Sequence, residues 1–448
     1  MAAPPLHPAL DRRTLLRLGG VAAVGATAAV TGCTRLHTGD DLPDVAGDYD
    51  GPPLTLRFWN GLTGGDGPVM RKLLAEFTEQ HPNIRIDMYA LPWTNFYQKF
   101  PAAVASGLAP DLGLMHNFQV ATNAVRGVLS PVDSIMAELG LTEADYPPTV
   151  WNSGIVAGQR YSIPLDVWPD SLFYNRRVLA DAGLDPDDPP QTGDAYLAAL
   201  DTLAGHGIQG HWLPAVDPQG VGRGFDSLLW QHGGTHYDEA GAEPLFDSDA
   251  GRAALSWQRT LIDNGFSPRD TSGSDANVAF KNDRNAFLWG GPGALINDLG
   301  KVDGLDWAAA PLPRIGDRPA AFCGSHQFVI TRRRRFDADR VRALVTFLGW
   351  ITANSLDWAA AGPIPARRPV LDDPAFAELA PQASIARGID AIRFYPLIPG
   401  IAEVQTTILY PAIGDALLGN LTVPDALATA ARQARFLLEE NLTKYRGS

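Results

Sequence analysis

The sequence of 448 residues contains few features that would point to disulfides, membrane spans or nucleic acid. Its only two cysteines, Cys33 and Cys323, cannot build a disulfide framework and lack the partners of a zinc motif. The longest apolar candidate, residues 18–30, is shorter than the ~20 residues that a spanning helix needs. Basic residues number 36 against 50 acidic ones, which gives a net charge of −14. This balance argues against nucleic acid or anionic lipid as a partner.

Catalytic and nucleotide-binding motifs are scarce as well. The loop NGLTGGDGP at residues 60–68 has neither the ending of a P-loop nor a GxGxxG fingerprint. No G-x-S-x-G elbow occurs, and no pair of carboxylates stands out. Two glycines between His232 and His236 favour a surface turn over a metal site. Cys323 lies near His326, but a buried structural cysteine is the preferred reading. We therefore predict no catalytic residue, no cofactor and no metal.

The chain does contain the marks of an export signal at its start. Arg12 and Arg13 precede a short apolar region that ends in small residues. The paired arginines resemble a twin-arginine signal, and VTGC at residues 30–33 resembles the lipobox of bacterial lipoproteins. We predict a signal peptide over residues 1–32 and lipidation of Cys33, which would anchor the protein outside the cell membrane. A plain secretory signal with an incidental cysteine is the alternative, and the export route stays open.

Two segments have the composition of solvated chain. Residues 33–53 are rich in Gly, Pro and Asp and poor in periodic apolar residues, so we predict a flexible tether there. Four successive arginines at residues 332–335 lie between an apolar stretch and a helical pattern, and we expect a solvated loop.

The body of the chain has the pattern of an α/β protein. Residues 54–59 and 84–88 alternate like strands, and the segment between them places Val69, Leu73 and Phe77 on one helical face. A strand–helix–strand unit predicts a parallel sheet covered by helices. The C-terminal third has mainly helical patterns. Because the chain is too long for one ordinary core, two domains are expected.

Aromatic and amide side chains gather on the loops that follow the strand-like segments, where open α/β sheets bind ligands. Flat rings suit the apolar faces of sugars, and polar side chains suit the hydroxyls. The set comprises Trp59, Asn60, Trp93, His116, Asn117, Asp166, Trp168, Trp230, Trp289 and Tyr395. Trp59 and Trp230 lie inside apolar segments and are expected in the core. Trp168 lies between two prolines, outside the expected regular structure, and favours a ligand contact.

Several stretches, in this order, resemble the extracellular solute-binding protein family of bacterial carbohydrate importers of the maltose, trehalose and glycerol-phosphate type. They include LRFWNGLTGGDGPVMRKLLAEFTEQHPNI, ASGLAPDLGLMH, YSIPLDVWPDSLFYN, NAFLWGGPGALIND and AAGPIPARRPV, and the match covers nearly all of residues 54 to 440. The resemblance implies the two-lobed type II periplasmic-binding-protein fold, an α/β fold in which each lobe is a mainly parallel sheet flanked by helices. We predict residues 54–173 with 312–352 as one lobe, and 174–311 with 353–448 as the other.

The resemblance also implies a function and a site between the lobes. The chain would capture a mono- or oligosaccharide as a monomer and deliver it to the permease subunits of an ABC importer. The loop set and the family positions together predict these ligand contacts: Asn60, Gly61, Thr63, Gly64, Trp93, His116, Asn117, Asp166, Trp168, Arg223, Trp289, Gly291, Gly324, Ser325, His326 and Arg367. Asp166 is expected to be the strongest polar contact. The GPG turn at residues 291–293 departs from the GPW of many sugar binders, so the resemblance implies no stacking platform there.

Two other functions remain open. A glycerophosphodiester or polyol could be the ligand, because Arg223, Arg367, His116 and His326 could hold a phosphate. A tethered hydrolase is less favoured, because the sequence shows neither an acid–base pair nor a nucleophile.

Overall fold

Alternating burial along strand β1 (Leu54–Asn60) places one of its faces in the core of the first lobe. In the computed structural model, which describes residues 42–445, this strand belongs to a sheet of the order β2-β1-β3-β12-β6. β1 runs parallel to β2 and β3, and β12 runs antiparallel to β3 and β6. The other bounds are β2 (Ile84–Ala90), β3 (Leu112–His116), β6 (Ile163–Pro164) and β12 (His326–Ile330).

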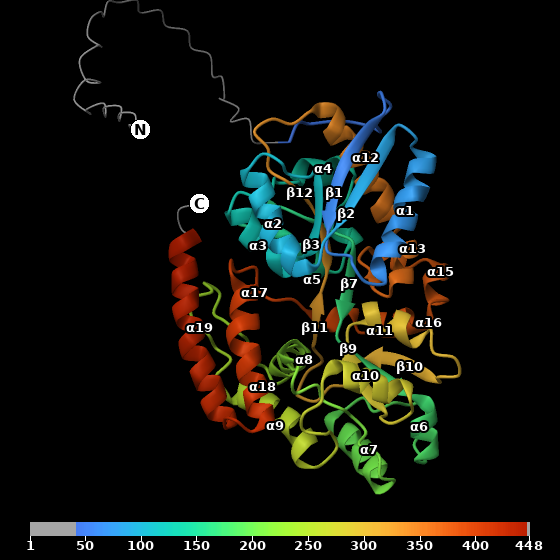
Figure 1. Cartoon of the computed structure of the whole chain (residues 1–448), viewed down its shortest axis with the longest axis vertical. Helices are drawn as coiled ribbons and strands as arrows, with labels where there is room; N and C mark the ends of the chain where they lie inside the picture. Colours follow the sequence, from blue (N-terminus) through green and yellow to red (C-terminus); the bar gives the residue numbers. More distant parts are fainter. Residues whose placement is uncertain (1–41, 446–448) are drawn as a thin grey trace, which may run out of the picture. The chain divides into compact units, whose positions relative to one another are not determined.

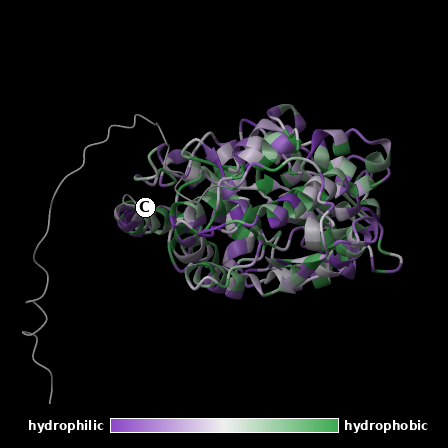
Figure 2. Cartoon of the chain, turned by 90° about the horizontal axis from the view of Figure 1, so that it is seen from above, coloured by the Kyte–Doolittle hydropathy of each residue, from purple (hydrophilic) through white to green (hydrophobic). Residues whose placement is uncertain are grey.

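Amphipathic helices cover this sheet in the upper part of Figure 1. Helix α1 buries Leu73 and Phe77 of the predicted apolar face, together with Met70, whereas Val69 is only partly buried. Figure 2 shows hydrophilic and hydrophobic residues on the same helices, as expected where one face meets a core. The elements are α1 (Asp66–Gln80), α2 (Trp93–Ala105), α3 (Asn117–Val125), α4 (Asp133–Glu138), η1 (Glu143–Asp145), α5 (Pro148–Asn152), β4 (Ile155–Val156), β5 (Gln159–Arg160) and α12 (Ala338–Ala353).

The second lobe is built on a three-stranded sheet of the order β10-β8-β9. Both pairings in it are antiparallel, which differs from the mainly parallel sheet expected for each lobe. The side chains of Thr192, Asp217, Ser248 and Ser272 cap the N-termini of four of its helices. The elements are β8 (Ser171–Asn175), α6 (Arg176–Asp181), α7 (Gly193–Gly205), α8 (Pro218–Gln231), α9 (Asp249–Asp263), α10 (Gly273–Lys281), β9 (Phe287–Gly290), α11 (Pro292–Leu299) and β10 (Trp307–Pro311).

A small sheet of the order β13-β7-β11-β14 lies between the two lobes (Figure 1). Its strands are β7 (Asp166–Pro169), β11 (Ala321–Gly324), β13 (Ile364–Pro365) and β14 (Ile392–Arg393). Trp168 therefore lies inside a strand, and the expectation that it lies outside regular structure is wrong. The pairing of Trp168 with Gly324 joins residues far apart in the sequence, so local patterns give no sign of it.

The last part of the chain is mainly helical, as the sequence predicts. The elements are α13 (Ser355–Trp358), η2 (Ala359–Ala361), α14 (Arg368–Leu371), α15 (Pro374–Ala377), α16 (Ala380–Ala386), η3 (Ile389–Ala391), α17 (Ile401–Val404), η4 (Gln405–Leu409), α18 (Tyr410–Leu418) and α19 (Val423–Tyr445). The segment η4 is a π-helix that joins α17 to α18, and these helices stand beside the second lobe in red (Figure 1).

The largest hydrophobic core runs through the first lobe and into the crossing strands. It contains Phe58 and Phe328 of the first sheet, and also Trp358 of α13 and Phe280 of α10. Because this core includes residues from both predicted lobes, it marks no border between them. The lobe boundaries at residues 173, 312 and 353 stay a prediction.

The tether prediction is wrong for residues 42–53. Tyr49 is 5% exposed and its backbone N–H donates to Thr346 Oγ1 at 2.8 Å. Asn83 Nδ2 donates to the Tyr49 carbonyl at 3.1 Å, and Leu42 is buried as well. Burial of Leu42 and Tyr49 therefore fixes residues 42–53 against the folded body, although the composition of this segment is mainly that of a tether. The predicted signal peptide, Cys33 and residues 34–41 lie outside the described residues. Within residues 42–445, no helix has both the length and the apolar character of a membrane span.

Candidate ligand-binding site

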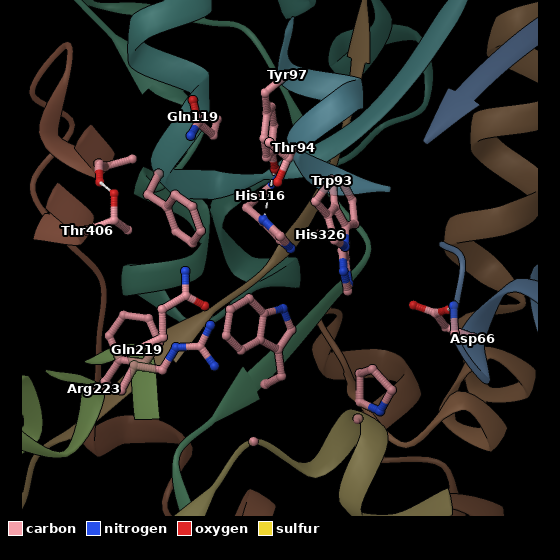
Figure 3. A pocket seen from close by; sticks show the side chains of 18 of the residues that line it. Asp66, Trp93, Thr94, Tyr97, His116, Gln119, Gln219, Arg223, His326 and Thr406 are labelled. Carbon is pink, nitrogen blue, oxygen red and sulfur yellow. Dashed lines mark hydrogen bonds between the residues drawn. The ribbon is translucent and has the colours of Figure 1, made fainter. Parts of the chain in front are cut away.

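A cavity of about 1150 Å³ opens beside the crossing strands and takes its walls from both lobes. The first lobe contributes residues from the start of α1, from α2 and from the ends of β3 and β12. The second lobe contributes α8 and α11, and the C-terminal helices add α17, η4 and the start of α18. Figure 3 shows Trp93, His116 and His326 together on one wall, with Arg223 and Gln219 below them and Asp66 to one side.

Aromatic rings form the wall on the first-lobe side. Trp93 lies 4.2 Å from His116 and stacks on His326 at 5.7 Å, measured between ring centroids. Trp168 from β7 lies 5.6 Å from His116 and is only 8% exposed. Such flat, mostly apolar surfaces suit the C–H faces of sugar rings or other apolar ligand parts.

Two glycines make room for the two indole rings. A Cβ atom at Gly61 would lie 2.0 Å from Trp93 Cδ2, and one at Gly324 would lie 1.9 Å from Trp168 Cζ2. Any side chain at either position would push the ring away. Gly61 and Gly324 therefore do not line the cavity, and they act on it by positioning Trp93 and Trp168.

The best polar candidate from the sequence, Asp166, does not reach the cavity. It is fully buried, and its Oδ1 accepts the His326 backbone N–H at 2.7 Å. Its Oδ2 accepts from His326 Nδ1 and from Trp358 Nε1, each at 2.7 Å. The prediction of a direct contact is corrected: the carboxylate is occupied by protein donors and holds the imidazole of His326 against the cavity.

Two buried donors at the cavity have no hydrogen-bond partner among residues 42–445. They are Trp168 Nε1 and Gln405 Nε2. Buried donors without partners are costly, so a ligand or water that accepts from them would be stabilising. Gln405 comes from the π-helix η4, and such segments are frequent at functional sites. The oxygen of Gln405 is already bound by the Tyr237 hydroxyl at 3.0 Å.

Arg223 lines the cavity, and a buried carboxylate on the same helix holds two tyrosines there. The Arg223 guanidinium lies over the Trp168 ring at 5.2 Å and makes no ion pair among the described residues. Asp226 accepts from His236 Nε2 at 2.6 Å and from the hydroxyls of Tyr410 and Tyr395. Burial raises the pKa of Asp226, while His236 and Arg223 oppose that rise. This network fixes the two tyrosine rings at the cavity.

The structure brings seven of the sixteen predicted contacts to the cavity wall: Gly64, Trp93, His116, Trp168, Arg223, Gly291 and His326. Nine do not line it: Asn60, Gly61, Thr63, Asn117, Asp166, Trp289, Gly324, Ser325 and Arg367.

Several of these nine side chains are held away from the cavity by other interactions. Asn60, Asn117 and Ser325 are buried behind the wall, and Asn117 Oδ1 accepts the Ser325 N–H at 3.2 Å. Trp289 stacks on Trp257 in the second lobe at 5.4 Å. Arg367 pairs with Asp145 at 3.6 Å.

Thr63 is exposed on the loop before α1. Trp59 and Trp230 were expected in the core, and both are half-buried against it. Cys323 is a free, buried thiol in β11, as expected.

Several lining residues were not predicted. They include Tyr97, Phe118, Gln119, Gln219, Gln405, Thr406 and Tyr410. Tyr97 lies one turn after Trp93 on α2, so the helical period that follows a predicted contact could have found it. The residues of η4 gave no signal, because a π-helix has no distinct pattern in the sequence.

The family model of the bacterial extracellular solute-binding proteins matches residues 61–348, which is more than half of the chain. The chain belongs to this family. Membership confirms the prediction of an extracytoplasmic solute-binding protein. The solved structures that resemble the chain confirm the two-lobed fold.

Three relatives illustrate the range of this solute-binding family. The sn-glycerol-3-phosphate-binding periplasmic protein UgpB of Escherichia coli K12 is 29% identical over 147 residues, which are 31% of this chain and 33% of that protein. The chain thus matches about a third of the length of this curated relative.

Two solved structures cover far more of the chain. The sugar-binding protein MalE of Xanthomonas citri is 21% identical with a TM-score of 0.77, covering 88% of this chain and all of that one. UgpB of Mycobacterium tuberculosis, solved with glycerophosphocholine, is 20% identical with a TM-score of 0.74, covering 88% and 99%.

Proposed function

We propose that this solute-binding protein captures an oligosaccharide outside the membrane and delivers it to the permease of an ABC importer. The observation that carries the proposal is the interlobe cavity with its two indole faces, Trp93 and Trp168. Its volume of about 1150 Å³ exceeds the 300–1,000 Å³ typical of sites for drug-sized ligands, which favours an oligomer over a single sugar. The direct contacts proposed are the seven predicted residues on the wall together with Gln405.

The charges of the cavity are compatible with a neutral ligand. Asp66, Asp298 and Glu403 line its rim, and Arg223 and Lys301 supply the opposite sign. The unpartnered donors Trp168 Nε1 and Gln405 Nε2 could bind hydroxyl or ring oxygens.

The test is a thermal-shift screen of the mature chain against malto-oligosaccharides of increasing length, cyclic glucans and phosphodiesters. A ligand that binds the native state raises the melting temperature in proportion to the logarithm of its concentration. Calorimetric titration then gives the stoichiometry. A clear shift with an oligosaccharide supports the proposal, and shifts only with phosphodiesters contradict it.

A second candidate ligand is a glycerophosphodiester. The observation that favours it is Arg223, which makes no ion pair among residues 42–445 and lines the same cavity as His116 and His326. Of the two UgpB proteins among the similar proteins, one is named for sn-glycerol-3-phosphate and the other was solved in complex with glycerophosphocholine. Binding of an anion should weaken as salt rises, because charge pairs are screened, and it should require Arg223. Binding of a neutral sugar should be insensitive to salt. Arg223→Gln, measured at low and high salt, separates the two.

We also propose that the mature protein is a monomer held at the membrane by lipid on Cys33 after cleavage behind Gly32. The VTGC lipobox at residues 30–33 supports this. Cys33→Ser should move the protein from the membrane fraction to the soluble one. An unchanged membrane fraction would contradict the anchor, and normal export after Arg12 and Arg13 are both changed to Lys would contradict the twin-arginine route.

A further inference from the structure

The cavity wall contains two histidines whose hydrogen bonds are fixed in opposite ways. His116 ends β3 and His326 begins β12, and their ring centroids are 5.3 Å apart. Each ring uses Nδ1 for a protein partner: the Tyr97 hydroxyl at 2.8 Å for His116, and Asp166 Oδ2 at 2.7 Å for His326. Neither Nε2 atom has a protein partner among residues 42–445, so Nε2 is the atom available to a ligand in both rings.

His116 is held as a neutral donor. The Tyr97 oxygen accepts the His116 backbone N–H at 3.1 Å. Its hydroxyl has no other acceptor among residues 42–445, so its proton is assigned to Nδ1 of His116. The remaining proton of the neutral ring is then on Nε2. Burial lowers the pKa of His116 well below its ordinary value, and the charges of His326 and Arg223 add to this. His116 thus offers the same N–H at any pH at which the protein works.

His326 is held in the opposite arrangement. A carboxylate only accepts, so Asp166 requires the proton of the His326 ring on Nδ1. Nε2 is an acceptor in the neutral ring and a donor in the charged ring. Burial opposes the charged form, but the attraction of Asp166 outweighs burial and raises the pKa of His326. Nε2 of this histidine therefore changes from an acceptor to a donor when the ring takes up a proton.

Few other charges face His326. His116 on β3 is neutral, and Asp66 at the start of α1 favours the charged ring at longer range. Helices α2 and α13 present only indole rings, Trp93 and Trp358, and β7 adds Trp168 besides Asp166. Asp166 is therefore the group that decides the protonation of His326.

We propose that His326 takes up a proton at Nε2 when ligand binds, so that the site holds ligands rich in acceptor oxygens more tightly in acid than in base. The step adds one proton from solvent to the imidazole lone pair, and the new N–H is donated to a hydroxyl, ether or phosphate oxygen of the ligand. A hydrogen bond from a charged donor is about twice as strong as a neutral one, so the ligand stabilises the charged ring. Asp166 is the positioning residue. The inference rests on the proposed function only in requiring that the cavity binds a ligand.

The first test needs no ligand. Histidine Cε1–H signals are followed by NMR from pH 5 to 9. We expect the midpoint of His326 to lie above the ordinary pKa of an imidazole, and His116 not to titrate in this range. In Asp166→Asn the His326 signal should shift its midpoint to lower pH. Equal titration of His116 and His326, or no response to Asp166→Asn, would overturn the inference.

The second test uses two probes, maltotriose and glycerophosphocholine, titrated calorimetrically at pH 6 and pH 8 in buffers of different ionisation enthalpy. For the probe that binds, we expect net proton uptake and an affinity that falls by up to about tenfold per pH unit above the pKa of His326. His326→Gln, which cannot take up a proton but still fits, should bind with no pH dependence. Binding without proton uptake would overturn the inference. If neither probe binds while the NMR result stands, the proposed choice of ligand fails and the protonation behaviour of His326 does not.

Discussion

At the residue scale, the glycines beneath the two indole rings are as important to the site as the rings themselves. Gly324→Ala places a methyl group where Trp168 Cζ2 and Cη2 now lie, so the ring must leave its place over the cavity. Loss of an aromatic anchor costs about 2 kcal/mol or more, so the affinity for the best ligand of the screen should fall at least about tenfold. Calorimetric titration measures this.

Gly205→Ala serves as the control for Gly324→Ala. Gly205 at the end of α7 has open space around it and does not line the cavity. This variant should bind ligand like the unmodified protein. A Gly324→Ala protein that binds with full affinity would show that Trp168 is not a contact.

Asp170 allows a prediction of pH-dependent stability. Burial raises the pKa of this carboxyl to about 7, although Arg223 opposes the rise. Its ordinary pKa is about 3.9, so the stability that it contributes is complete below pH ~4 and is lost as pH rises through ~7. Asp170→Asn cannot acquire a buried charge and should melt higher than the unmodified protein at pH 8, but not at pH 4.

Thermal unfolding at the two pH values measures the effect of Asp170→Asn, with the exposed Asp201→Asn on α7 as its control. A variant that is less stable at pH 8 than at pH 4, relative to the unmodified protein, would mean that Asp170 is charged and paired in the fold.

Single residues show where sequence reasoning reaches and where it ends. Trp93, Trp168 and His326 were predicted because their residue types suit a sugar, and all three line the cavity, although Trp168 lies in a strand and not in a loop. Asp166 was misread as a contact, because the two donors that occupy it, on His326 and Trp358, come from segments more than 150 residues away. Sequence shows that a carboxylate is near a site, but not which groups already use its oxygens.

At the scale of elements, one buried carboxylate joins three parts of the first lobe. Asp111, 3% exposed at the start of β3, accepts the backbone N–H of Arg57 on β1 at 2.7 Å. It also pairs with Arg333 at 2.9 Å and with Arg340 of α12 at 2.7 Å. The arginine run was expected to be a solvated loop, and Arg333 departs from that expectation.

Removing Asp111 should destabilise the fold. Asp111→Ala leaves the partly buried guanidinium groups without their carboxylate, which typically costs about 3 kcal/mol for such pairs. Denaturant unfolding should show a lower midpoint for Asp111→Ala, and the exposed control Asp303→Ala should keep the midpoint of the unmodified protein.

The effect of Asp111 should also depend on pH. Burial opposes ionisation of Asp111, but its hydrogen bonds with Arg340 and Arg57 outweigh burial and lower its pKa. Its contribution is therefore present at neutral pH and is lost in acid, so the two proteins should converge in stability there.

Elements with local signals were predicted well, and those built by distant pairing were not. Helix α1 lies between the two predicted strands, as expected, because its apolar spacing is a local signal. The strands β7, β11, β13 and β14 pair only across long stretches of chain, and β7 was read as a loop. The same limit applies to residues 42–53, where Tyr49 packs against a helix almost 300 residues later.

At the scale of the whole molecule, the fold could be predicted because many short stretches, in order, resemble one family. The division into lobes was inferred from that resemblance. The hydrophobic core does not mark it, because the core continues from the first lobe through the crossing strands. These strands, β7 and β11, are short and lie next to the cavity wall. A small rotation about them would move Arg223 and Gln405 toward or away from Trp93.

We therefore predict that ligand binding closes the lobes. A ligand shifts the equilibrium only by its preference for the closed form, and a cavity lined by both lobes supplies that preference, because contacts with both are made together only when the lobes approach. Small-angle X-ray scattering should show a smaller radius of gyration at saturating ligand, and Gly324→Ala at the same concentration should show less change.

A hydrogen bond between the two sides of the cavity should oppose opening of the lobes. Thr122 Oγ1 of α3 accepts the Gly400 N–H beside α17 at 2.8 Å. Thr122→Ala should therefore scatter as a more open particle without ligand. An identical profile for free and saturated protein would mean that the cavity is a rigid pocket.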